Sequence, residues 1–275
     1  MTIAHIIPHL RSGALPTAWR GARRRWRGLL AQVGSVCPAC EGAARGGLLC
    51  AACLEAVSVQ AARRRCPRCA LRLSASRAAQ HGGLCVECAL YPPAFARAVA
   101  AFDYDDPFDE LIARYKGARR YVVASALAQA LERAVRAGDA VPGISPSSSS
   151  APACRPVDAL VPVPASRASL RQRGFNPAGE LARALAHRME TRLLRGVLRR
   201  RHETPARQAS LSRPDREAAA LDLYLCTQPL AGLHIALVDD VMTTGSTADA
   251  AARALLAAGA VEVSVWVAAR TPRPG

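Results

Sequence analysis

The chain has 275 residues, of which 51% are hydrophobic, and this excludes a protein that is disordered throughout. No uninterrupted apolar run approaches the ~18 residues that a membrane-spanning helix needs, so we expect no membrane span. The formal net charge is +16, and Lys116 is the only lysine. A Walker A loop needs a lysine followed by serine or threonine within a glycine-rich pattern, so that class of nucleotide site is excluded.

Positive charge is concentrated in the first third of the chain. Residues 1–90 hold 13 arginines and three acidic residues, Glu41, Glu55 and Glu87. A segment this basic can contact the phosphate backbone of nucleic acid. A coding bias towards arginine and alanine would give the same composition, so charge alone leaves both interpretations open.

Residues 1–36 form a basic leader without a single acidic residue. It contains an arginine cluster at residues 20–27, and Trp19 and Trp26 stand seven positions apart, on one face of any helix. Three interpretations remain open: an amphipathic helix that binds nucleic acid, a mitochondrial transit peptide, and a weakly ordered leader. The segment lacks the continuous apolar stretch of a secretory signal peptide, and we expect a cytoplasmic protein.

The next segment, residues 37–93, carries eight of the ten cysteines in four C-x-x-C pairs. In chain order the pairs are Cys37 and Cys40, Cys50 and Cys53, Cys66 and Cys69, and Cys85 and Cys88. Two such turns converge on one tetrahedral ion, so the pattern predicts a double zinc ribbon with two four-cysteine sites. Interleaved pairing of the turns would use the same eight ligands. Disulfides are the competing interpretation, which reducing conditions inside the cell disfavour.

Four thiolates fill the coordination sphere of zinc, and no position remains for water or substrate. We therefore expect both zinc ions to be structural. Few large apolar side chains lie in this segment, so the metal must supply much of its folding free energy. The other two cysteines, Cys154 and Cys226, are expected to be unpaired thiols without a role.

From Ala94 onwards, apolar strands alternate with helices, which is typical of a doubly wound parallel sheet. A flexible linker or insertion rich in serine and proline is expected at 138–156. Asn176 and Pro177 fit the N-cap and first position of one helix. The expected strands are 96–106, which leads into a turn, 158–164, 233–240 and 261–269, and the expected helices are 107–116, 121–137, 176–189 and 246–260.

The most informative stretch is Leu237–Thr247, LVDDVMTTGST. An apolar strand runs into Asp239 and Asp240, and a short turn then leads into a helix. Ligands of open α/β sheets bind at the carboxyl ends of strands, and helix N-termini bind phosphate. We expect the turn to hold a monophosphate, and the two carboxylates to accept hydrogen bonds from a ribose diol or to help hold Mg²⁺. The turn residues are Thr243, Thr244, Gly245, Ser246 and Thr247.

This stretch closely resembles the phosphoribosyl pyrophosphate (PRPP) motif of type I phosphoribosyltransferases. Together with VPVPASRASLRQRGFNPAGELARAL, the Arg/Thr/Gln-rich segment before the motif and the cysteine pairs, the chain resembles the ComF family over about residues 37–272. Members of that family are associated with bacterial DNA uptake in natural competence. The resemblance implies a type I phosphoribosyltransferase-like domain at 94–275, behind a small four-cysteine zinc-ribbon module.

The resemblance also implies roles for individual residues. Asp239 and Asp240 would contact the ribose diol, and Thr243 to Thr247 would bind the 5′-phosphate. Pro164, Ala165 and Ser166 would form the pyrophosphate loop, with Arg171 and Arg173 beside it, since arginine suits pyrophosphate oxygens. Arg207–Arg216 would form a mobile loop over the substrate.

Three functions remain open on this basis. The first is a Mg²⁺-dependent phosphoribosyltransferase with PRPP as donor and an unidentified acceptor. The second is a protein that binds single-stranded DNA, together with partners in DNA uptake or replication. The third is a zinc-ribbon interaction module on a degenerate transferase fold.

Overall fold

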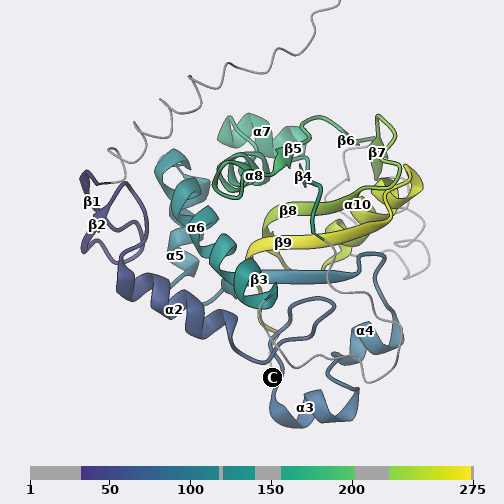
Figure 1. The fold of residues 1–275 in the computed structure, drawn as a ribbon, viewed down its shortest axis with the longest axis horizontal. Helices are drawn as coiled ribbons and strands as arrows, with labels where there is room; N and C mark the ends of the chain where they lie inside the picture. The colour runs from purple at the N-terminus through teal and green to yellow at the C-terminus, as the bar shows by residue number, and fades with distance from the viewer. Residues whose placement is uncertain (1–31, 118–119, 140–155, 202–222, 274–275) are drawn as a thin grey trace, which may run out of the picture.

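The computed structural model describes residues 32–117, 120–139, 156–201 and 223–273. Its centre is a sheet of five parallel strands in the order β3-β9-β8-β4-β5 (Figure 1). The strands are β3 (Arg97–Asp103), β4 (Ala159–Pro162), β5 (Arg192–Leu193), β8 (His234–Met242) and β9 (Glu262–Arg270). The predicted α/β class and parallel sheet are confirmed.

Helices cover both faces of the sheet because the strand side chains alternate between two apolar cores. In β8, Ile235 and Leu237 belong to one core, whereas Ala236 and Val238 belong to the other. The first core includes residues of α3 (Ala75–Gln80), α4 (Val86–Leu90) and α10 (Ser246–Ala257). The second includes residues of α2 (Ala51–Ala61), α5 (Asp109–Lys116), α6 (Arg120–Asp139) and α8 (Pro177–Arg188).

The strand and helix expectations from Ala94 onwards are confirmed to within a few residues. Asn176 is the N-cap of α8 with Pro177 behind it, but its side chain makes no capping hydrogen bond. Its amide Nδ2 instead donates to the carbonyl of Val163 at 2.9 Å. Three short elements were not expected from the sequence: α7 (Arg167–Arg173), β5, and the strand β6 (Leu198–Arg200), which pairs with β7 (Tyr224–Cys226) in an antiparallel ladder.

The cysteine-rich segment is more helical than its sequence suggested. It begins with a small ribbon of β1 (Gly34–Val36) and β2 (Ala43–Arg45) and continues through α2, α3 and α4. Cys50 and Cys85 are the N-caps of α2 and α4, and their sulfurs accept hydrogen bonds from the N–H groups of Cys53 and Cys88. Each of these two thiols therefore caps a helix and also belongs to a cysteine cluster.

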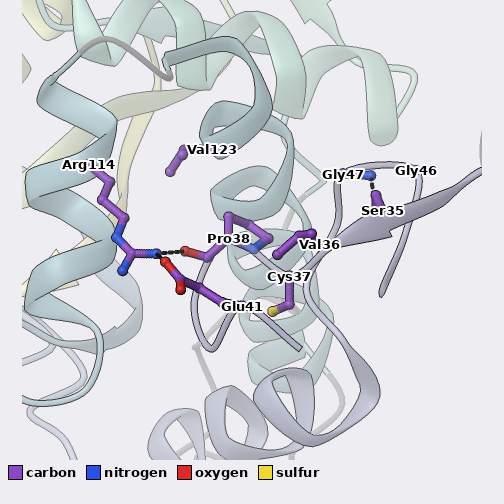
Figure 2. Close-up of a pocket in the computed structure, with 9 residues that line it drawn as sticks. All are labelled: Ser35, Val36, Cys37, Pro38, Glu41, Gly46, Gly47, Arg114 and Val123. Carbon is purple, nitrogen blue, oxygen red and sulfur yellow. Dashed lines mark hydrogen bonds and ion pairs between the residues drawn. The ribbon is translucent and has the colours of Figure 1, made fainter. Parts of the chain in front are cut away.

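The front of this segment lies against α5 and α6 (Figure 2). The guanidinium of Arg114 donates to the carbonyl of Pro38 at 3.1 Å and pairs with the carboxylate of Glu41 at 3.1 Å. The N–H of Leu49 donates to Oε1 of Gln129 at 2.9 Å. A hollow lined by Arg114, Pro38, Glu41 and their neighbours lies at this junction, and it contains none of the residues of the predicted phosphate site.

A buried carboxylate joins the middle of the cysteine-rich segment to the end of β3. Asp103 is 1% exposed and pairs with Arg65 at 2.7 Å, Arg72 at 3.3 Å and Arg63 at 3.4 Å. Its N–H donates to Oε1 of Gln60. Burial lowers the pKa of Arg65, and the charge of Asp103 opposes that shift. Neither charge is therefore stable in this position without the other.

None of the helices in the described ranges has the length and hydropathy that crossing a bilayer requires.

Replacing Asp103 by asparagine should destabilise the protein strongly, because it leaves the buried guanidinium of Arg65 without its counter-charge. Removal of one partner from a buried ion pair costs about 3–5 kcal/mol. The measurement is denaturant unfolding of the zinc-loaded protein. Asp105→Asn, at an exposed position two residues further on, is the control and should stay close to the parent protein. A loss below about 1 kcal/mol, the range of surface pairs, would show that the Asp103 pairs contribute no more than exposed ones.

Candidate functional site

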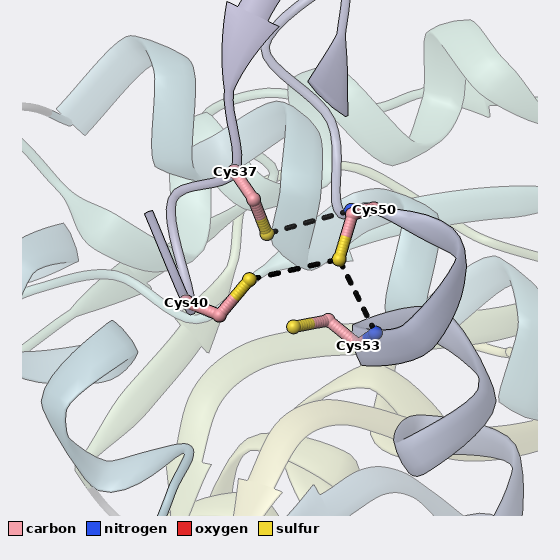
Figure 3. Close-up of side chains that lie close together, drawn as sticks. All are labelled: Cys37, Cys40, Cys50 and Cys53. Atoms are coloured by element: carbon pink, nitrogen blue, oxygen red, sulfur yellow. Dashed lines mark hydrogen bonds between the residues drawn. The ribbon is translucent and has the colours of Figure 1, made fainter. Parts of the chain in front are cut away.

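The eight paired cysteines form two clusters, in the chain order that the sequence predicted. In each cluster the four sulfurs lie within 4.8 Å of one another. The first cluster is Cys37, Cys40, Cys50 and Cys53, and in Figure 3 its four sulfurs point towards one common centre. The second is Cys66, Cys69, Cys85 and Cys88. Four convergent thiols at this separation suit a tetrahedral zinc ion, so both clusters could hold zinc.

The two clusters differ in burial. All four cysteines of the second cluster are buried, whereas Cys40 of the first is exposed and Cys50 and Cys53 are partly buried. The first cluster packs with the core beneath α5, α6 and α8, and the second with the core beneath α10. The clusters therefore lie on opposite faces of the sheet.

The thiol pKa values in each cluster diverge. Burial raises the pKa of Cys37, but hydrogen bonds from the N–H groups of Cys40, Cys50 and Ala39 lower it to about 7. Hydrogen bonds from Cys69 and Cys88 lower the pKa of Cys66. The pKa of Cys53 is raised by burial, and that of Cys88 by its hydrogen bonds to Cys66 and Cys69. Each cluster thus favours the thiolate at one cysteine and disfavours it at another, and a bound cation relieves the repulsion between thiolates.

The predicted phosphate site lies where the order of the sheet reverses. The chain moves outward from β4 to β5 on one side and from β8 to β9 on the other, so the switch point is between β4 and β8. These strands are in register, with Pro162 opposite Val238. Ligands of open α/β sheets bind in the crevice beyond the carboxyl ends of the strands at such a point. The loop after β4 and the turn after β8 both begin there.

The turn after β8 leaves its polar groups open to solvent. Thr243, Thr244 and Ser246 are exposed, and the hydroxyls of Thr244 and Ser246 lie 3.0 Å apart. Gly245 is the N-cap of α10 with a φ of 89°, a left-handed conformation that favours glycine, and no side chain caps the helix. Gly245 itself offers no side-chain acceptor, and of the first N–H groups of α10 that of Ser246 donates to the hydroxyl of Thr244 at 3.4 Å. Such a helix start suits an anion.

The two aspartates stand at the end of β8. Both are partly buried, and they differ in the charges next to them. Burial raises the pKa of Asp239 well above its ordinary value, and the charge of Asp240 raises it further. The Oδ2 of Asp240 makes no hydrogen bond among the described residues, and the ammonium of Lys116 lies 3.1 Å from it. Lys116, at the end of α5, is thus the counter-charge of this acidic pair.

The loop after β4 is held on both sides. The N–H of Val163 donates to the carbonyl of Val238 at 2.9 Å, and Asn176 binds the Val163 carbonyl. Pro164 and Ala165 follow, both partly buried, and Ser166 is the N-cap of α7, where its hydroxyl accepts from the N–H of Ser169.

The two arginines that the sequence singled out lie in the last turn of α7. Arg171 is exposed, and Arg173 donates to the hydroxyl of Ser169 at 3.4 Å. Within the described residues, neither pairs with Asp239 or Asp240. The β4 loop and the β8 turn thus begin at the ends of neighbouring strands. Both guanidinium groups lie on α7, the helix that follows the β4 loop, and neither is paired with an acid of the site in the part of the chain that the structure describes.

Sequence reasoning missed several residues around this site. Asn176 was expected only as a helix cap, and Lys116 was noted only as the single lysine. Tyr224 of β7 is 3% exposed, and the charge of Asp239 contributes to the raised pKa of its hydroxyl, after burial. The expected mobile loop Arg207–Arg216, most of the leader and of the linker, and Cys154 lie outside the described residues.

Zinc should leave the two clusters at different rates, because the first is open to solvent at Cys40 and the second is buried. A colorimetric chelator added to the zinc-loaded protein should therefore record two phases of equal amplitude. Cys40→Ser should remove the fast phase only. Cys226→Ser, at a thiol outside both clusters, is the control and should keep both phases. A single phase, or loss of the slow phase in Cys40→Ser, would contradict the assignment.

Replacing Asp239 by asparagine should stabilise the protein at neutral and alkaline pH. Its folded pKa is raised, so the folded chain binds this proton more tightly than the unfolded chain does. The free energy of unfolding therefore falls as pH rises from the unfolded pKa of about 4 through the folded pKa. Removing the acid should raise the Tm by about 2–4 °C at pH 8, which corresponds to about 1 kcal/mol.

The same variant should gain less at pH 5, where the proton is more fully retained. Thermal unfolding at both pH values tests this, with Asp109→Asn, an exposed acid on α5, as the control. A lower Tm for Asp239→Asn at pH 8 would contradict the prediction. It would mean that the charged carboxylate stabilises the folded protein and that favourable interactions offset the cost of its burial.

Comparison with known proteins identifies relatives over most of the chain, although no protein-family model matches it. DNA utilization protein YhgH of Salmonella typhimurium is 33% identical over 224 residues, which is 81% of this chain and 90% of the relative. The Escherichia coli protein of the same name is 31% identical over the same shares of both chains. Competence protein F of Haemophilus influenzae is 29% identical over 70% of this chain and 79% of its own. At this identity and coverage, the chain belongs to the family of these proteins, the ComF family.

Proposed function

We propose that the chain binds PRPP with Mg²⁺ at the switch point between β4 and β8, as a protein of the phosphoribosyltransferase type. The observation that carries this proposal is the turn after β8. Together with the end of β8, it combines two carboxylates, exposed hydroxyls and the N-terminus of α10 within nine residues of chain. A ribose 5-phosphate needs acceptors for its diol and donors for its phosphate, and this turn offers both.

In this proposal, Asp239 and Asp240 accept hydrogen bonds from the ribose 2′- and 3′-hydroxyls. The N–H groups and hydroxyls from Thr243 to Thr247 bind the 5′-phosphate. The loop Pro164–Ser166 follows the neighbouring strand, and it would hold the pyrophosphate with help from Arg171 and Arg173. Bound Mg²⁺ would neutralise charge on the pyrophosphate oxygens and is itself suited to carboxylate and phosphate oxygens.

The ion pair between Lys116 and Asp240 bears directly on this binding. Without ligand, the ammonium offsets the charge of Asp240 and so limits the repulsion between the two acids. A ribose diol or a cation at the same carboxylate competes with Lys116 for its oxygens. Ligand binding would therefore change the surroundings of both carboxylates, and the raised pKa of Asp239 would fall towards its ordinary value.

The reaction of such a site is the transfer of the phosphoribosyl group. The bond from C1 of the ribose to the pyrophosphate oxygen breaks, the oxygen keeps the electron pair, and a nitrogen of the acceptor forms the new bond to C1. Cationic side chains beside the leaving group would stabilise its developing charge. The described residues provide that charge in Arg171 and Arg173, and we name no general base and no acceptor.

A role in the use of DNA is the second part of the proposal. The relatives are named for DNA utilization and for competence. The strongly basic front of this chain suits phosphate backbones. Single-stranded DNA, DNA-uptake proteins and replication proteins are the corresponding partners, and the cytoplasm is the corresponding compartment. A zinc-ribbon interaction protein without transferase activity is the alternative.

Titration of the zinc-loaded protein with PRPP and Mg²⁺ in a calorimeter tests the proposal. Asp240→Asn should weaken binding by about 10- to 100-fold, since hydrogen bonds to a charged group contribute about 1.5–3 kcal/mol. Asp109→Asn is the matched control and should bind as the parent does.

Equal binding by both variants would mean that PRPP lies elsewhere. If the parent protein bound no PRPP but bound single-stranded DNA in a salt-dependent way, the non-catalytic alternative would replace the proposal.

A further inference from the structure

Arg270, at the end of β9, is buried beneath the turn that follows β8. It is 1% exposed, and its guanidinium donates only to main-chain carbonyls among the described residues. Its Nη1 binds the carbonyls of Met242, Thr243 and Thr271, and its Nε binds that of Cys69 at 2.9 Å. No carboxylate in the described ranges forms an ion pair with this buried positive charge.

These bonds fix the direction of the first peptide of the turn. A trans peptide is planar, and its C=O and N–H groups point in opposite directions. The Thr243 carbonyl points to the guanidinium of Arg270, so the N–H of Thr244 points away from it. The hydroxyl of Thr244 in turn accepts from the N–H of Ser246, at 3.4 Å. Arg270 therefore fixes the orientation of the Thr243–Thr244 peptide, which precedes the N–H donors of the turn.

The remaining bond of Arg270 reaches the second cysteine cluster. Cys69 is one of the four thiols of that cluster, and its carbonyl accepts the Nε of Arg270. A further contact ties the same region to the helix behind the turn, because the carboxylate of Asp249 in α10 accepts from the N–H of Ala94 at 2.6 Å. The start of α10 is thus tied to the residue that directly follows the segment containing the second cluster.

We propose that Arg270 is a positioning residue that couples the second cysteine cluster to the phosphate-binding turn. It holds the turn in the conformation that presents its N–H groups to a phosphate, and its buried charge favours an anion there. No hydrogen bond among the described residues joins the first cluster to this turn. Its link to the site runs through α5, where Arg114 binds the carbonyl of Pro38 and Lys116 pairs with Asp240. This inference rests on the proposed function, because it requires that the turn binds phosphate.

The test compares two probes that differ in the part of the site they occupy. Ribose 5-phosphate needs the turn after β8, whereas inorganic pyrophosphate with Mg²⁺ needs the loop after β4. Arg270→Lys keeps a positive charge but loses the planar fork that reaches several carbonyls, and Arg270→Gln loses the charge as well. Affinities for both probes are measured by calorimetry on the zinc-loaded variants.

We expect Arg270→Gln to weaken ribose 5-phosphate binding by at least about tenfold, and pyrophosphate binding by less than about twofold, where tenfold corresponds to about 1.4 kcal/mol. Arg270→Lys should recover part of the loss. Arg136→Gln, which removes an exposed arginine from α6, is the matched control and should change neither affinity. Equal losses for both probes would show that Arg270 only stabilises the fold, and unchanged ribose 5-phosphate affinity would overturn the proposal.

A second pair of variants changes the cysteine clusters and leaves Arg270 in place. Cys88→Ser in the second cluster should weaken ribose 5-phosphate binding, whereas Cys40→Ser in the first should not. Equal effects of the two variants would overturn the coupling. If the parent protein binds neither probe, the proposed function itself fails. If the parent binds both probes and its Arg270 variants bind them equally well, only the role of Arg270 fails.

Discussion

Buried charge at the carboxyl ends of β3 and β9 decides where the cysteine-rich segment lies. Asp103 and Arg270 stand opposite each other in neighbouring strands, and both are 1% exposed. Asp103 binds three arginines of the cysteine-rich segment, and Arg270 binds the carbonyl of Cys69. An unpaired buried charge is far more costly than a lost apolar contact, so these bonds select one position of the segment over its alternatives.

The aspartates at the end of β8 illustrate the opposite situation, in which burial is only partly compensated. Asp239 lies beside a second carboxylate, and the ammonium of Lys116 pairs with Asp240 instead. Like charges in adjacent positions destabilise the folded state. In the proposed function, a ligand at this site would supply the donors that the two acids lack.

The sequence predicted the strands and helices of residues 94–275 because long apolar runs and a clear cap, Asn176 with Pro177, define them. It did not predict β5 and β6, since segments of two or three residues carry no periodicity. The helices of the cysteine-rich segment were also missed. Cys50 and Cys85 cap helices with their sulfurs, and a C-x-x-C pattern signals only the metal.

The candidate site could be recognised from the sequence, but the residues that support it could not. The turn after β8 is contiguous in sequence, and its acids, hydroxyls and glycine could be recognised together. Lys116 and Arg270 reach it from other elements, 124 residues and 28 residues away along the chain from Asp240 and Met242. An arginine at the end of a strand is usually solvated, and only the tertiary structure shows that this one is buried.

The two cysteine clusters differ in the parts of the molecule that they hold. A four-cysteine zinc site leaves no coordination position for substrate, so it can influence a ligand only through the main chain that it holds. The first cluster holds the surface that lies against α5 and α6. The second holds a carbonyl that binds the arginine beneath the phosphate turn. In our proposal, the second cluster therefore bears on ligand affinity through the carbonyl of Cys69 and the guanidinium of Arg270.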